Sequence, residues 1–229
     1  MMTKTPSIAA LALAATLPLS ATQAQTHTSG PASRWYLSAS TGASFIGDAQ
    51  ATRVPVSGAA SQGQLRLGNG LMAGGTVGLQ LGADWRLEAD YNYRSNRLRA
   101  TSVPGLDATQ RDADLASVLI MANLLRDFDG WRTGWASFRP YVGAGLGIAQ
   151  EVDTDLNIAG VQREFSGNRA AWQLLAGVNW QYRSPWFAGV GLRWVDAGTV
   201  RLKATTPGQG DIRADYRGLG LDLRLGYRF

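Results

Sequence analysis

The chain of 229 residues has no cysteine and a single histidine. Without cysteine it can form no disulfide bond, thiol nucleophile or cysteine-ligated metal site. The one histidine, His27, precedes the first predicted strand, so we do not expect it to be held beside a serine as a catalytic base. The sequence therefore predicts a protein that is not an enzyme and has no cofactor.

Long apolar runs and clustered basic residues are also missing. After the first 24 residues no segment has the roughly 18 consecutive apolar residues of a membrane-spanning helix, yet 45% of the chain is hydrophobic. Basic residues exceed acidic ones by 22 to 17 but form no Lys/Arg run, which argues against a nucleic-acid partner. Alternating strands would explain this composition, because each hides its apolar face from a hydropathy window.

The N-terminal segment, residues 1–24, has the composition of a secretory signal peptide. Lys4 is its only charge, an apolar run extends from Ile8 to Leu19, and Thr22 and Ala24 provide a small-residue cleavage site. The run is shorter than the about 20 residues that span a bilayer as a helix, which disfavours a retained anchor. The expected organisation is a signal peptide at 1–24, a flexible polar tail at 25–33 and one folded domain at 34–229.

The C-terminal segment alternates strictly in polarity. From Leu219 to Phe229 the sequence is LGLDLRLGYRF, with leucine or an aromatic residue at every odd position and glycine or a charge at every even one. A period of two indicates a β-strand with one apolar face. An apolar face opposite a charged one, with an aromatic residue at the end, is typical of a transmembrane β-barrel strand.

Seven earlier segments alternate in a comparable way. The predicted strands are 34–45, 71–82, 85–97, 113–127, 139–152, 170–182, 186–195 and 219–229. Short turns alternate with long connections, as in outer-membrane barrels, and the long ones are 46–70, 98–112, 153–169 and 196–215. The predicted fold class is all-β: an eight-stranded antiparallel up-and-down transmembrane β-barrel with four long external loops and short periplasmic turns.

Three motifs, taken in order, carry a family resemblance. They are SVLIMAN at 117–123 followed by Asp127-Phe128, RPYVGAGLG at 139–147, and WQLLAG at 172–177. With the terminal aromatic residue they resemble the opacity-type, outer-membrane protein A-like family of eight-stranded barrels over roughly residues 35–229. The resemblance implies the outer membrane of a Gram-negative bacterium, with lipid and lipopolysaccharide as surroundings. It also implies that Tyr227 and Phe229 form the signal read by the outer-membrane assembly machinery.

The densest group of charges is predicted to point into the barrel. An eight-stranded barrel is only wide enough for side chains to fill, which favours a lumen plugged by ion pairs. The alternative is a narrow porin-like channel for small solutes, in which charged rings set selectivity. The predicted lumen charge network is Arg86, Glu88, Asp90, Arg94, Arg193, Asp222, Arg224 and Arg228.

The long connections carry the remaining candidate sites. One acidic segment loosely matches a calcium loop, with Glu151, Asp153, Asp155, Asn157 and Glu164 as the possible ligands. Ile158 occupies the position where that motif needs glycine, so no metal is expected. Scattered arginines in the loops are either solvated or in contact with lipopolysaccharide phosphates. The predicted function is structural or surface-interacting: loop presentation, envelope stability, or adhesion through contact with a host or envelope protein.

Overall fold

The structure, a computed structural model, describes residues 34–229 except 160, 183, 206–207 and 209. The predicted signal peptide, the tail and His27 lie outside the described residues. Within the described part of the chain, no helix is long and apolar enough to cross a membrane.

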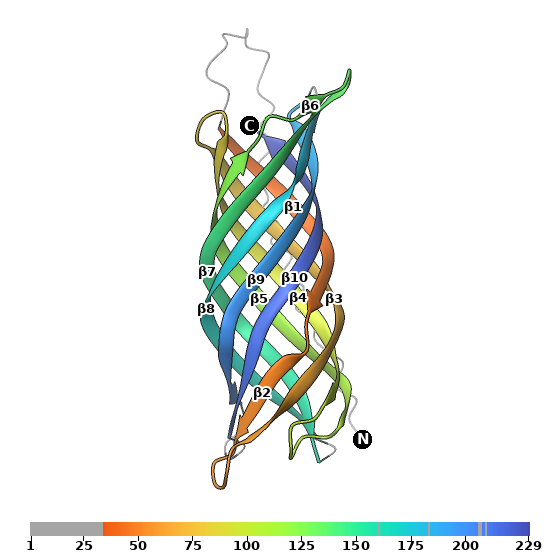
Figure 1. The fold of residues 1–229 in the computed structure, drawn as a ribbon, viewed down its shortest axis with the longest axis vertical. Helices are drawn as coiled ribbons and strands as arrows, with labels where there is room; N and C mark the ends of the chain where they lie inside the picture. Colours follow the sequence, from red (N-terminus) through yellow and green to blue (C-terminus); the bar gives the residue numbers. More distant parts are fainter. Residues whose placement is uncertain (1–33, 160, 183, 206–207, 209) are drawn as a thin grey trace, which may run out of the picture. The chain divides into compact units, whose positions relative to one another are not determined.

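Eight long antiparallel strands close into a ring (Figure 1). Strand β1 pairs with β3 on one side and with β10 on the other, and every other long strand pairs with its neighbours in the chain. The predicted eight-stranded up-and-down barrel is therefore confirmed. The long strands are β1 (Trp35–Ile46), β3 (Ser61–Gln80), β4 (Trp85–Thr101), β5 (Thr109–Asp127), β7 (Ala136–Ile158), β8 (Val161–Tyr182), β9 (Trp186–Ala204) and β10 (Asp211–Arg228).

Two short strands extend the sheet at opposite ends of the barrel. Strand β2 (Ala49–Val54) pairs with both β3 and β10, beyond the end of β1. Strand β6 (Trp131–Arg132) forms a small hairpin with the start of β7. In Figure 1, β6 marks the end where β1 begins and β10 finishes, and β2 marks the other end.

The strands are longer than predicted at the β2 end. Strands β7 and β8 pair out to Ile158↔Val161, inside the connection expected at 153–169. Strand β9 continues to Ala204 and β10 starts at Asp211, so most of 196–215 is also strand. The same correction holds for 46–70, which contains β2 and the first half of β3, and for 98–112, of which only 102–108 is not strand. The connections at this end are thus mainly sheet.

The half of the barrel near β6 has an apolar outer surface, and we call it the membrane section. On β1, Trp35, Leu37 and Phe45 face outward and are exposed, whereas Tyr36 and Ser44 between them are buried in the lumen. The interval from Trp35 to Phe45 matches the about 9–11 residues with which a tilted strand crosses a bilayer.

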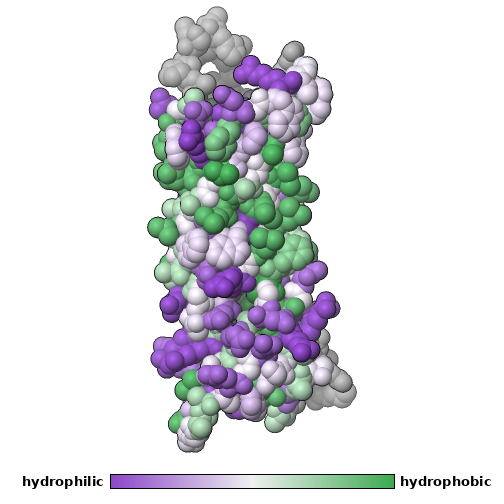
Figure 2. Space-filling view, viewed as in Figure 1, coloured by the Kyte–Doolittle hydropathy of each residue, from purple (hydrophilic) through white to green (hydrophobic). Residues whose placement is uncertain are grey.

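Toward β2, the polarity of both faces reverses along the strands that continue past the end of β1, in what we call the distal section. On β10 the inward set changes from Asp222 and Arg224 to Tyr216, Ala214 and Ile212, all buried. The outward residues change from leucines to Arg217, Asp215 and Arg213, and the outward positions remain the odd-numbered ones along the whole of β10. Figure 2 shows the result, with hydrophobic residues gathered over the half near β6 and hydrophilic ones over the half near β2.

An apolar core fills the distal section. Residues from every long strand and from β2 contribute to it, so the distal strands form a closed barrel with the polarity of a water-soluble protein. Its larger members include Leu65, Leu98, Leu115, Leu119, Leu156, Phe165, Val200, Leu202, Ile212 and Tyr216.

Candidate functional site

The lumen of the membrane section holds two groups of ion pairs. The first, which we call the Glu88 cluster, is centred on Glu88 of β4. Its Oε1 accepts hydrogen bonds from Tyr36 Oη at 2.6 Å, Arg86 Nη1 at 2.9 Å and Arg224 Nη1 at 2.9 Å. Arg86 also pairs through Nε with Asp127 Oδ2 at 3.0 Å. One carboxylate oxygen thus ties together β1, β4 and β10, and Arg86 adds β5.

The second group, the Arg193 cluster, lies around Arg193 of β9. Arg193 Nη1 donates to Asp90 Oδ2 at 2.7 Å, and Nε donates to Asp222 Oδ2 at 3.3 Å. Asp90 accepts a further hydrogen bond from the Thr76 hydroxyl at 3.0 Å. All four side chains are buried, so these are desolvated, charge-assisted contacts that bridge β3, β4, β9 and β10.

Two predicted members of the network have no carboxylate partner among the described residues. Arg94 is fully buried, donates through Nε to Asn92 Oδ1 at 3.0 Å, and leaves both Nη atoms without a partner. Arg228 lies at the β6 end with its guanidinium carbon 5.4 Å from the centre of the Phe187 ring. The structure therefore joins six of the eight predicted residues into ion pairs and places these two outside them.

Asp127 and Tyr36 complete the network, although the sequence prediction did not include them in it. Both occupy inward-facing positions in the alternation of their strands, and this alternation could have identified them from the sequence. Four buried arginines (Arg86, Arg94, Arg193 and Arg224) are matched by four buried carboxylates (Glu88, Asp90, Asp127 and Asp222) in this section. Formal neutrality lowers the cost of keeping so many charges away from bulk water.

Glycine makes room for the largest lumen side chains. A Cβ at Gly78 of β3 would overlap the Tyr36 ring, and one at Gly226 of β10 would overlap the Phe187 ring. The two rings meet edge-on, with centroids 5.5 Å apart. The lumen near the β6 end is therefore filled by aromatic rings packed against bare backbone.

The segment that loosely matches a calcium loop is strand rather than loop. Asp153 lies on β7 and Glu164 on β8, within one continuous hairpin. The side chains of Asp155 and Asn157 lie outside the described part of the structure. Where side chains are described, no group of three or more potential ligands could hold a metal ion.

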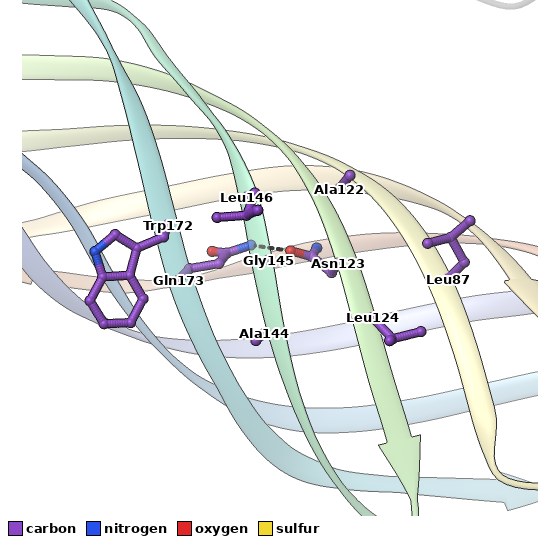
Figure 3. Close-up of a pocket in the computed structure, with 9 residues that line it drawn as sticks. All are labelled: Leu87, Ala122, Asn123, Leu124, Ala144, Gly145, Leu146, Trp172 and Gln173. Carbon is purple, nitrogen blue, oxygen red and sulfur yellow. Dashed lines mark hydrogen bonds between the residues drawn. The ribbon is translucent and has the colours of Figure 1, made fainter.

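A shallow apolar groove of about 760 Å³ crosses the outer wall over β4, β5, β7 and β8 (Figure 3). Leu87, Leu124, Leu146 and Trp172 stand around it, and Gly145 forms part of its floor. On the lumen side of Gly145, Gln173 Nε2 donates to Asn123 Oδ1 at 2.6 Å across β7. The three residues pair in register, so a side chain at position 145 would break this bridge.

The comparisons agree with this geometry. Residues 9–229 match the protein family described as outer membrane protein beta-barrel domain. The chain belongs to this family. It is thus an outer-membrane β-barrel protein of the Gram-negative type, located in the outer membrane. No curated protein matches the chain.

Solved outer-membrane barrels have a similar fold. Neisserial surface protein A is 19% identical with a TM-score of 0.52, and the match covers 87% of this chain and 100% of that one. OprG of Pseudomonas aeruginosa is 15% identical with a TM-score of 0.56 and coverages of 87% and 98%. AlkL, solved in lipid bilayers, is 14% identical with a TM-score of 0.53 and coverages of 91% and 96%. At these identities the similarity establishes the fold alone.

The outer-membrane barrel carries exposed aromatic residues at its β6 end, where the short turns lie. Trp186 packs edge-on against Tyr227 at 5.2 Å, and Tyr227 against Phe229 at 5.5 Å. Trp131 of the β6 hairpin stacks on Phe138 at 5.2 Å. Such rings occupy the headgroup level of a bilayer. Tyr227 and Phe229 are therefore placed at the lipid interface, and their role in assembly stays a prediction.

Proposed function

We propose that this outer-membrane barrel is a structural and surface-interaction protein that presents a rigid, closed distal section outside the cell. The observation that supports this most is the double closure of the lumen. Ion pairs fill it within the membrane section, and an apolar core fills it beyond. The outward arginines and aspartates of the distal section then form the surface available to a host or envelope protein.

The alternative is a narrow porin-like channel for small solutes. Several buried polar atoms, such as Glu88 Oε2 and Arg94 Nη1, have no protein partner, and single ordered waters could satisfy them. A continuous water column would also have to pass the distal core, where Leu119 and Val195 are fully buried. Apolar constrictions of this kind stop conduction by dewetting.

Catalysis is not part of the proposal. Glu88, Asp90, Asp127 and Asp222 each contact an arginine. A general acid or base must exchange a proton with its substrate, and a carboxylate fixed by a guanidinium is poorly suited to that role.

The proposal includes the expected processing of the chain. Residues 1–24 would be removed as a signal peptide, 25–33 would remain as a short tail, and 34–229 would form the barrel. Tyr227 and Phe229 would be read by the assembly machinery. Sequencing the N-terminus of the protein extracted from outer membranes tests the cleavage position.

Two measurements test the function. In planar bilayers the purified protein should give no stable single-channel steps, and large stable channels would overturn the plugged barrel in favour of the channel. On intact cells, replacing the outward Arg201, Arg213 and Arg217 of the distal section by glutamine should reduce binding of host-cell or serum proteins, or weaken the envelope, at equal surface amounts. If both properties are unchanged in this variant, the surface role is wrong.

A further inference from the structure

A second groove lies over β3, β4 and β5, where the membrane section meets the distal section. It has a volume of about 690 Å³. On the membrane side it is bounded by Leu71, which is 77% exposed, and Tyr93, which is 43% exposed. On the distal side it is bounded by Arg97 and Arg99. The groove therefore changes from apolar to basic at the expected level of the outer-leaflet headgroups.

A β-bulge lies beside this groove. The pairing of β3 with β4 shifts between Arg66 and Leu67 and again between Leu67 and Gly70, which leaves Gly68 and Asn69 out of register. A Cβ at Gly68 would lie 2.8 Å from Arg99 Nε, so the Arg99 side chain extends across the bulge toward β3. Bulges re-aim side chains locally, and this one brings a guanidinium over the groove.

The groove is lined by two arginines and one acid. Arg97 and Arg99 form no ion pair with the acids whose side chains the structure describes, whereas Arg201 pairs with Asp211 at 2.6 Å and Arg217 with Asp196 at 2.9 Å. Asp114 lies opposite Arg97 in the pairing of β4 with β5, and its carboxylate accepts a hydrogen bond from the Ser95 hydroxyl at 2.9 Å. The lining residues therefore carry one more positive than negative charge.

We propose that this groove binds a phosphorylated glycolipid of the outer leaflet. An acyl chain lies along Leu71 and Tyr93, and a headgroup phosphate accepts hydrogen bonds from Arg97 and Arg99. The planar guanidinium fork fits phosphate oxygens better than the point charge of lysine. The inference deepens the envelope-stabilising part of the proposed function, and it requires no host or protein partner.

The test uses purified protein in detergent micelles with diphosphorylated lipid A as the probe, and native mass spectrometry measures the lipid retained. Arg97→Gln/Arg99→Gln should lower retention at least about tenfold, which corresponds to about 1.4 kcal/mol. Lys203→Gln/Arg213→Gln removes the same charge from the outward face of β9 and β10 and should retain lipid like the wild type. Asp114→Asn should increase retention.

The remaining arms identify the ligand chemistry. The wild type and Arg97→Gln/Arg99→Gln should retain fully dephosphorylated lipid A equally. Inorganic phosphate at millimolar concentration should not displace intact lipid A from the wild type. Retention that is equal in the wild type and Arg97→Gln/Arg99→Gln, or that falls equally in the control pair, would overturn the site. Displacement by inorganic phosphate alone would show an anion site without lipid specificity and would also overturn the proposal. These outcomes leave the conductance and surface-binding tests unaffected.

Discussion

Arg193 and Arg94 form a matched pair for testing what the lumen charges contribute. Both are fully buried arginines of the membrane section, but Arg193 forms ion pairs with Asp90 and Asp222, whereas the hydrogen bond of Arg94 among the described residues goes to the amide oxygen of Asn92. Methionine replaces the aliphatic part of either side chain with little change of volume. We expect Arg193→Met to lower the free energy of unfolding by about 3–5 kcal/mol, because it leaves two buried carboxylates without their cation.

Arg94→Met should cost much less. It removes one hydrogen bond, worth about 1 kcal/mol, and also removes two buried Nη groups whose desolvation is not repaid. We expect a change between a small loss and a small gain. The difference between the two variants should reach about 2 kcal/mol or more, which is about 30-fold in the unfolding equilibrium.

Urea unfolding in lipid vesicles, followed by tryptophan fluorescence, measures both variants. A background with Asp90→Asn and Asp222→Asn serves as the control, because Arg193→Met should then cost much less. Equal losses for the two methionine variants would refute the assignment of the ion pairs. A loss under about 1 kcal/mol for Arg193→Met would mean that water reaches the carboxylates, which contradicts a plugged lumen.

Three further predictions concern the membrane section, the distal section and the C-terminal residue. Leu223→Arg, on the lipid-facing side of β10, should lower the free energy of unfolding by about 2–4 kcal/mol. Arg213→Leu, on the same face of the strand but in the distal section, should change it little. Equal effects of the two variants in urea unfolding would contradict the position of the membrane section. Trypsin added to intact cells should cut the distal section slowly, since Arg97, Arg201 and Arg213 lie in paired strands; rapid cleavage on a gel would show mobile loops instead. Phe229→Ala should lower the amount of folded protein in the outer membrane more than refolding into detergent in vitro, and equal surface levels would argue against a role in assembly.

The membrane section could be predicted from sequence because its alternation has a simple source. On β10, lipid requires leucine at 219, 221, 223 and 225, and the lumen accepts Asp222 and Arg224 between them. The same parity placed Glu88, Asp90 and Arg193 inside. It could not identify partners, because the contact of Glu88 on β4 with Arg224 on β10 depends on the stagger of strands across the lumen. Arg94 and Arg228 were assigned to the network only because their positions face inward, and an inward position does not show whether a carboxylate lies within reach.

The distal section was missed because its alternation is reversed. Ile212, Ala214 and Tyr216 alternate with Arg213, Asp215 and Arg217, which is the pattern of an ordinary amphipathic strand. A search for outward apolar residues stops where the outward positions become charged. The bulges in the β3–β4, β8–β9 and β9–β10 pairings interrupt the pattern further.

The reversal of polarity along continuous strands also affects how the exposed surface can diversify. In a mobile loop, any residue can change under pressure from antibodies, and insertions are tolerated. In the distal section only every second position faces outward, and its neighbours fill the apolar core, where a polar substitution would be costly. Sequence drift in descendants of this protein should therefore be concentrated at alternate residues. Antibodies that recognise the native surface should bind discontinuous epitopes across adjacent strands, and synthetic peptides copied from single segments should compete poorly for them.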